Sequence, residues 1–257
     1  GDAEFVELFP TPLLRCQWPQ SEQLNRELRE VILDKFEEEQ GRSRVQRSNI
    51  GGWQSLKDLH TWPQPCVARL NERIDALVRE MVRRVVPDPL PGHLEGWQFH
   101  AWANVNRRGA KNRSHVHLHE KSTVWSGIYY VDAGEDLLGG AASGLTKLED
   151  RSGVPKEIIR SRDPFEREIS ICPRPGLMVL FSSKLWHRVE TFQGEGSRIT
   201  IAFNLSHPGF VIPAYPELET KTSEATVTGS KAWLWRNFRG IMLAASMVKA
   251  RIRKPLG

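Results

Sequence analysis

The chain has 257 residues, of which 39% are hydrophobic and nine are tryptophans; this composition indicates a folded globular protein and excludes a disordered one. Its formal net charge is +5, but residues 231–257 alone carry seven Lys or Arg and no acidic residue. The rest of the chain therefore has a net charge of −2 (+5 less +7), which argues against a main body that binds nucleic acid along a basic groove.

The cysteines and the short apolar stretches indicate in which cellular compartment the protein resides. The three cysteines, Cys16, Cys66 and Cys172, form no CxxC pair, which argues against a disulfide framework and against a zinc ribbon. We therefore expect a reducing, cytoplasmic setting. No opening apolar segment resembles a signal peptide, and the longest apolar stretches, such as residues 241–248, are too short to span a bilayer.

The first third of the chain, residues 1–92, predicts two amphipathic helices that support the rest of the fold. Ser21 can cap the first helix and Gly41 ends it, whereas the second follows Pro63 and stops at the prolines of residues 87–91. The apolar faces, at three- and four-residue spacing, comprise Leu24, Leu28, Val31, Ile32 and Phe36 in the first helix and Val67, Leu70, Ile74, Leu77, Val78, Met81 and Val85 in the second.

Residues 93–210 have a different pattern, in which short apolar runs alternate with Gly, Pro and Asp turns. The predicted strands are residues 97–105, 124–131, 168–171, 177–181 and 198–205. Many short strands without helices between them indicate an antiparallel sandwich or barrel. We expect a mainly β fold with flanking helices, specifically a double-stranded β-helix of the jelly-roll or cupin type.

Histidines within this barrel region predict a metal site. His115 and His117 are two residues apart, so on a strand both would face the barrel interior and could bind one ion. A distant third candidate, His187, follows an apolar strand and a short turn. Three ligands on one face of an ion leave the opposite face free for a co-substrate and dioxygen.

A candidate anion site lies eleven residues after His187, on an alternating strand that carries Arg198 and Thr200 on one face. A guanidinium beside a hydroxyl provides a bidentate, charge-assisted socket for a carboxylate. A lone arginine is more often part of a surface ion pair. Together with the histidines, the socket is the interpretation that we favour.

Several stretches of the chain together resemble the 2-oxoglutarate-Fe(II) oxygenase family, within the wider prolyl-hydroxylase-like and cupin-type oxygenases. They are residues 7–12, 49–55, 102–106, 126–131, 175–183 and 198–204. The similarity runs from about Glu7 to Pro208. It implies a dioxygenase that uses Fe(II), 2-oxoglutarate and dioxygen, with ascorbate as a supporting reductant, and that couples decarboxylation of 2-oxoglutarate to succinate with hydroxylation of an unactivated C–H bond.

The resemblance also implies roles for individual residues. It assigns iron ligation to His115 and His187, and it places the side-chain carboxylate of 2-oxoglutarate on Arg198. Tyr130 resembles the tyrosine that assists this anchoring in related hydroxylases. The residues assigned to the co-substrate are Arg198, Thr200, Tyr130 and Asn104, although a buried core amide is nearly as good an interpretation of Asn104.

Position 117 departs from the wider superfamily, which usually carries Asp or Glu two residues after the first histidine. His117 leaves three alternatives: a centre of three histidines, a two-histidine centre completed by water, or a carboxylate recruited from elsewhere, such as Glu120. We favour three histidines, because Glu120 is out of phase unless a turn after Leu118 brings it round. For His119, which is in phase, we favour an exposed or supporting role.

The substrate is expected to be an amino acid, a peptide residue or a small metabolite, and one possibility is a biosynthetic precursor peptide. Two segments, residues 132–150 and 156–167, are candidate lids, although ordinary surface loops fit the pattern equally well. The basic residues Arg160, Arg162 and Arg167, together with the tail, suggest an anionic substrate.

We expect one oxygenase domain over residues 1–230, followed by a basic amphipathic helix over residues 231–257 that docks on the barrel or forms a homodimer contact. Two rival functions use the same features. One is a catalytically silent barrel that binds zinc or nickel and a ligand or partner. The other is a regulatory protein whose tail contacts nucleic acid or an anionic membrane.

Overall fold

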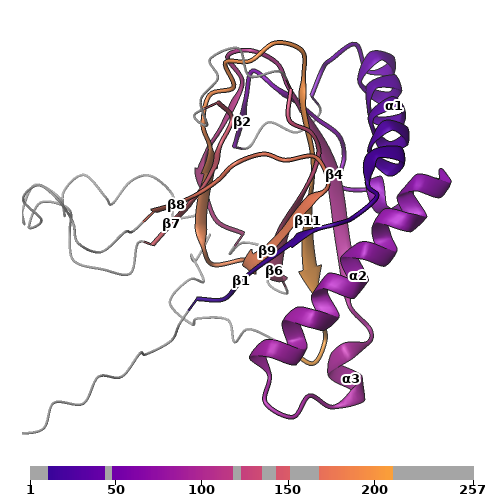
Figure 1. Ribbon diagram of the computed structural model, residues 1–257, viewed down its shortest axis with the longest axis vertical. Coiled ribbons are helices and arrows are strands. Elements are labelled where there is room, and N and C mark those ends of the chain that lie inside the picture. Colours follow the sequence, from indigo (N-terminus) through magenta and orange to yellow (C-terminus); the bar gives the residue numbers. More distant parts are fainter. Residues whose placement is uncertain (1–10, 44–47, 118–122, 135–142, 151–167, 211–257) are drawn as a thin grey trace, which may run out of the picture. The chain divides into compact units, whose positions relative to one another are not determined.

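The computed structural model describes residues 11–43, 48–117, 123–134, 143–150 and 168–210. Within these residues two antiparallel sheets face each other and helices cover one of them (Figure 1). The predicted class, mainly β with flanking helices, is therefore confirmed. No described helix combines the length and the apolar character that crossing a membrane would require.

The larger sheet has six strands, and its centre is the long strand β11. In spatial order the strands are β1 (Leu13–Gln17), β9 (Leu177–Ser182), β6 (Thr123–Asp132), β11 (Arg198–Ser206), β4 (Gln98–Asn106) and β3 (Trp53–Gln54). The strand β11 pairs antiparallel with β6 on one side and with β4 on the other. Residues at alternate positions of these three strands therefore share the face that looks into the barrel.

The smaller sheet has five short strands. In spatial order they are β2 (Asn49–Ile50), β5 (Lys111–His115), β10 (Trp186–Val189), β7 (Thr146–Glu149) and β8 (Glu168–Ile171). His115 and His187 are direct cross-strand partners in the β5–β10 pair. Hydrogen bonding between neighbouring strands thus brings together two histidines that are 72 positions apart in the sequence.

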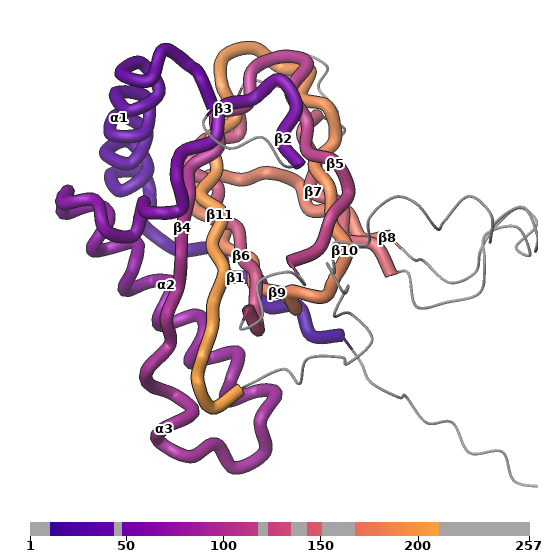
Figure 2. Tube along the Cα trace, turned by 180° about the vertical axis from the view of Figure 1, so that it is seen from behind, coloured from indigo at the N-terminus to yellow at the C-terminus, as the bar shows by residue number. Residues whose placement is uncertain are grey.

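Both predicted long helices are present, as α1 (Glu22–Glu38) and α2 (Pro65–Val85), with the short helices η1 (Leu59–Thr61) and α3 (Pro91–Leu94). Figures 1 and 2 show α1 and α2 on the side of the larger sheet, away from β5, β10 and β7. Their fully buried side chains join the core of that sheet, and each such Leu or Ile contributes about 1.5–3 kcal/mol. The helices thereby stiffen the sheet that carries β11. Val85, expected on the apolar face, is 36% exposed because α2 ends there.

Two expectations about local structure need correction. The first third was expected to be helical support, yet it also contributes β1, β2 and β3 to the two sheets. These strands are five residues long or shorter, too short to show a clear period in the sequence. Ser21 is the N-cap residue of α1, but its side chain does not cap the helix; its hydroxyl donates to the Trp18 carbonyl at 3.2 Å.

The expected lid over residues 132–150 also differs from the structure, since its last part forms strand β7. Several expectations fall outside the described residues. They are the middle of that lid, the segment 156–167 with its arginines Arg160, Arg162 and Arg167, the residues His119 and Glu120, the domain boundary at residue 231 and the helix over residues 231–257.

Candidate metal centre and its pocket

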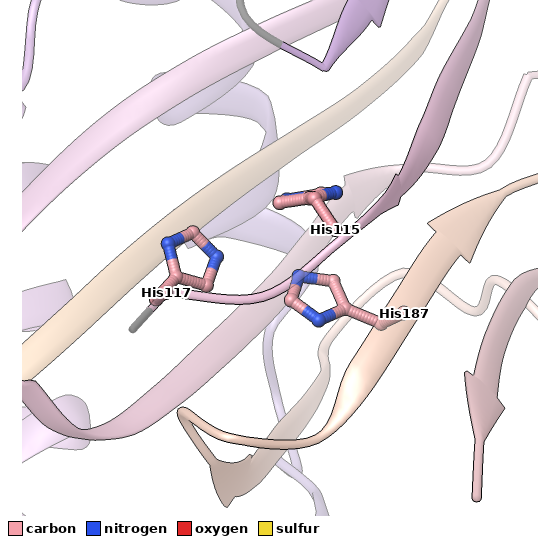
Figure 3. A group of neighbouring side chains, drawn as sticks. All are labelled: His115, His117 and His187. Carbon is pink, nitrogen blue, oxygen red and sulfur yellow. The ribbon is translucent and has the colours of Figure 1, made fainter. Parts of the chain in front are cut away.

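Three histidine side chains converge inside the barrel. One nitrogen each of His115, His117 and His187 lies within 4.8 Å of the other two (Figure 3). The ring centroids of His115 and His187 are 4.2 Å apart, and His117 lies 5.1 Å from each of them. Among the described residues no Asp or Glu joins this cluster. The donor set is therefore three imidazoles, which suits iron, zinc, copper or nickel.

His117 reaches the cluster by a different route from the expected one. The strand β5 ends at His115, so strand phase does not place His117. Instead, the backbone N–H of His117 donates to the Ser183 carbonyl at 3.0 Å, in the turn that follows β9. This hydrogen bond fixes the chain just beyond β5 and brings the third ring beside the other two.

The backbone fixes which nitrogen His115 and His187 can offer to an ion. The Nδ1 of His115 lies 2.8 Å from the Arg113 carbonyl, and that of His187 lies 2.9 Å from the Leu185 carbonyl. A carbonyl oxygen can only accept, so each Nδ1 carries the proton and each Nε2 keeps its lone pair. Both rings are therefore prepared to bind a metal through Nε2, with the second nitrogen oriented as metal-binding histidines require.

Burial keeps these two rings uncharged. It lowers the pKa of His115, and it lowers the pKa of His187 well below the ordinary value, with further lowering by the neighbouring His115 and His117. A histidine must lose its proton before it can bind a metal. The barrel interior thus holds both rings in the form that binds a cation.

Arg198 is a buried cation at the start of β11, with only 1% of its surface exposed. Its guanidinium lies 5.4 Å from the centre of the Tyr130 ring, and Nη2 donates a long, 3.4 Å hydrogen bond to Thr146 Oγ1. Its Nε is buried without a hydrogen-bond partner, and no described carboxylate pairs with it. A buried cation in this state is costly, so the site is suited to an incoming anion.

Hydroxyl-bearing side chains from both sheets lie in the region of this guanidinium. The Tyr130 hydroxyl, fully buried on β6, donates to Thr146 Oγ1 at 2.8 Å. Thr200 is the cross-strand partner of Tyr130 and lies two residues after Arg198 on β11. Thr146 was missed in the sequence because its strand fell inside an expected loop. The only signal was the alternation of Thr146 with Leu148, both of which are buried.

One cavity of about 440 Å³ joins the histidines to Arg198. Most of the residues predicted to form the site line it, namely His115, His117, His187, Arg198, Thr200 and Asn104; Tyr130 lies behind Arg198. The cavity wall also includes Trp102, whose ring has the Lys57 ammonium 4.9 Å from its centre, and the exposed Arg113. No Asp or Glu is among its described lining residues, so the cavity favours anionic ligands.

Comparison with known proteins connects this cavity to a family. Residues 100–204 match the family described as Putative 2OG-Fe(II) oxygenase, a stretch that includes all three histidines and Arg198. No curated protein matches the chain.

Solved structures share the fold at low sequence identity. A prolyl-4-hydroxylase from Pseudomonas putida is 14% identical, with a TM-score of 0.53 over 76% of this chain and 92% of that one. A prolyl hydroxylase from Trichoplax adhaerens, solved with a peptide of hypoxia inducible factor, is 13% identical, with a TM-score of 0.54 over 76% and 83%. HygX from Streptomyces hygroscopicus, with nickel and 2-oxoglutarate bound, is 14% identical, with a TM-score of 0.52 over 78% and 85%.

These structures confirm the double-stranded β-helix that the strand pattern predicted. Residues 100–204, which contain His115, His117, His187 and Arg198, thus match the 2OG-Fe(II) oxygenase family, and the solved structures share the fold of this chain.

Proposed function

We propose that this chain is a 2-oxoglutarate-dependent iron dioxygenase that hydroxylates an unactivated C–H bond of an amino acid, a peptide residue or a small metabolite, while 2-oxoglutarate is decarboxylated to succinate. The observation that carries the proposal is the joint lining of one cavity by three convergent histidines and a buried, unpaired arginine. A ligand that is both a chelator and a dicarboxylate satisfies both groups at once.

The metal would be held by His115, His117 and His187. Bound iron supplies the activation of dioxygen, which no side chain of the cavity can provide. The protein supplies His115 and His187 with Nε2 unprotonated, and it keeps carboxylates of the described residues away from the centre. With no anionic ligand, the metal would keep its full charge and attract an anionic co-substrate more strongly.

The far carboxylate of 2-oxoglutarate would pair with Arg198. Its guanidinium offers the hydrogen-bond donors, and Thr200 adds a hydroxyl on the same face of β11. Thr146 accepts hydrogen bonds from both Arg198 and Tyr130 and so helps to position the guanidinium. Asn104 also faces the cavity, and its Oδ1 is buried without a hydrogen-bond partner, which favours a contact with a bound ligand over a satisfied core amide.

His117 is the ligand that most needs a test, because water or Glu120 could complete the centre instead. The convergence of the three rings favours His117. We expect His117→Ala to weaken iron binding and to lower succinate release in step. Full iron affinity together with full turnover in this variant would show that the third ligand is another group.

The substrate that fits the cavity best is anionic. Lys57 and Arg113 stand on its wall with no described acidic residue, and Trp102 provides an apolar surface beside Lys57. An acidic residue within a peptide, such as a biosynthetic precursor peptide, offers both a negative charge for the two cations and apolar surface for the tryptophan. Substrates of this class would be drawn in by the positive field.

The experiment is a screen with matched substrates. The protein is incubated with iron, 2-oxoglutarate, ascorbate and pairs of peptides or amino acids that differ only as Asp against Asn or Glu against Gln. We expect succinate release and the mass gain of one oxygen atom, with the acidic member preferred and with no product from His187→Ala. Absence of succinate under every condition, despite bound iron, would contradict the proposal and favour a silent metal-binding barrel, since three neutral histidines also suit zinc.

We also propose a compartment and a domain organisation for the enzyme. All three cysteines, Cys16, Cys66 and Cys172, are free, which supports a reducing cytoplasmic compartment. We further propose one oxygenase domain over residues 1–230 and a basic helix over residues 231–257 that mediates a homodimer contact. The mass of the full chain in solution, compared with that of a chain ending at residue 230, tests the dimer contact.

A further inference from the structure

The third histidine differs from the other two in what holds its second nitrogen. His115 and His187 face backbone carbonyls, whereas Nδ1 of His117 lies 3.2 Å from the side-chain amide of Asn204. Asn204 in turn accepts a 2.9 Å hydrogen bond at Oδ1 from the hydroxyl of Ser126. A side-chain amide thus faces Nδ1 of His117, where a backbone carbonyl faces Nδ1 of His115 and of His187.

Asn204 and Ser126 form a fixed pair inside the barrel. They are direct cross-strand partners on β11 and β6, and each is only 2% exposed. Both also line the cavity that contains the histidines. Because the pair is buried, its hydrogen bonds cannot be exchanged freely with solvent, and the orientation of the amide matters energetically.

That orientation determines what His117 can do. While the amide nitrogen of Asn204 donates to Nδ1, the ring proton of neutral His117 lies on Nε2, which then has no lone pair for a metal. If the amide turns over, Oδ1 accepts from Nδ1–H and Nε2 becomes a donor to the metal. The Ser126 hydroxyl can donate or accept, so it supports both orientations.

We propose that Asn204 is a positioning residue which, backed by Ser126, sets the tautomer of His117 and so decides whether that histidine binds the metal. This inference rests on the proposed function, because it assumes a metal at the three histidines. In this arrangement the tautomer of His117 can change with the orientation of Asn204, whereas backbone carbonyls fix the tautomers of His115 and His187.

Cobalt(II) titration of the metal-free full-length protein, followed by visible absorption, tests the inference without any turnover. The informative variants are Asn204→Leu, which can neither donate nor accept, and Asn204→Asp, which in its charged form can only accept. We expect Asn204→Leu to weaken cobalt binding by roughly 10- to 100-fold, the usual effect of losing a partner of a metal-bound histidine. Asn204→Asp should bind cobalt at least as tightly as the wild type, since a carboxylate holds Nδ1–H and leaves Nε2 free.

A role in packing alone predicts the opposite order. Leu fills the buried space without charge, whereas Asp buries a carboxylate and should be the more damaging change. The far-ultraviolet circular dichroism of each variant verifies that it is folded. Should Asn204→Leu not fold, Ser126→Ala serves in its place: it removes the support of the amide, and we expect a loss of roughly two- to tenfold in cobalt affinity.

A double-mutant cycle locates the effect at His117. In a His117→Ala background, Asn204→Leu should cause no further loss of cobalt affinity. Wild-type affinity in Asn204→Leu, or an equal loss with and without His117, would overturn the inference.

Failure of the proposed function is distinguishable from failure of this inference. If His115→Ala and His187→Ala also bind cobalt like the wild type, there is no metal centre at these residues and the proposed function fails. If these two variants lose cobalt while Asn204→Leu keeps it, only the role of Asn204 is wrong.

Discussion

The cavity has two walls that carry charge in different ways. The histidine wall, His115 and His187 on the smaller sheet, consists of neutral rings whose protonated nitrogens face backbone carbonyls. The arginine wall, Arg198 with Thr200 on β11, carries a permanent buried cation whose Nε has no partner. The first wall becomes charged only when a metal binds, whereas the second is charged already. Mutations should therefore separate metal binding from co-substrate binding.

The largest expected effect is on the histidine wall. His187→Ala removes one of the proposed metal ligands. We expect metal affinity to fall by at least about 100-fold, which is more than the loss of a hydrogen-bond partner of a ligand causes. Competition with a chromophoric chelator measures this affinity. Its matched control is Arg188→Ala: Arg188 is the next residue on β10, yet it pairs with Glu149 and Glu168 outside the cavity. Equal losses in both variants would mean that the strand, and not the ligand, was disturbed.

The arginine wall should respond without any change in metal binding. Arg198→Met removes the cation, and we expect the KM for 2-oxoglutarate to rise by roughly 100-fold, the effect of two lost charge-assisted hydrogen bonds. Replacing an unpaired buried charge with an apolar side chain is often neutral or stabilising, so the midpoint of thermal unfolding should stay the same or rise. Succinate assays and thermal melts check both parts; a loss of metal affinity would show that the two walls are coupled.

The pH dependence of stability should come from the histidine wall. The pKa values of His115 and His187 are lowered in the folded protein, mainly by burial, while the unfolded chain takes up protons near the ordinary histidine value of about 6.5. The unfolded state then binds more protons, so the stability of the metal-free protein should fall as the pH drops through this value. Urea unfolding between about pH 8 and pH 5 measures the slope of the free energy of unfolding against pH. An unchanged slope in the double variant His115→Ala/His187→Ala would refute this origin.

The smallest expected effect concerns the support behind the arginine wall. Tyr130→Phe deletes one hydroxyl that donates to Thr146 and leaves the aromatic ring beside Arg198. We expect the KM for 2-oxoglutarate to rise by only about two- to tenfold, which corresponds to one neutral hydrogen bond. Metal affinity should not change. A rise as large as that of Arg198→Met would mean that Tyr130, and not the guanidinium, is the principal anchor.

For these two walls, the sequence predicted which residues share a strand face, but not the pairing register between strands. The helix faces and the strand β11 follow from periodicity alone, and alternation along β11 correctly places Arg198 and Thr200 on one face. The meeting of His115 with His187 was predicted from chemistry, but its cause is the cross-strand register of β5 and β10, which a sequence does not display.

Other features depend on packing between distant segments. Thr146 reaches Arg198 only because β7 of the smaller sheet faces β11 of the larger one. The role that we propose for Asn204 depends on its contact with Nδ1 of His117, 87 positions away in the sequence. Neither residue type, on its own strand, distinguishes such a contact from an ordinary buried polar side chain.

The most direct test of the account is the binding of 2-oxoglutarate, measured by calorimetry without dioxygen, to the protein with and without manganese(II). Both walls would hold one molecule of 2-oxoglutarate, and this arrangement predicts tight binding only to the metal-loaded wild type, weak binding to the metal-free protein, and weak binding to metal-loaded Arg198→Met. Equal affinity in the presence and absence of the metal, or unchanged affinity in Arg198→Met, would contradict it.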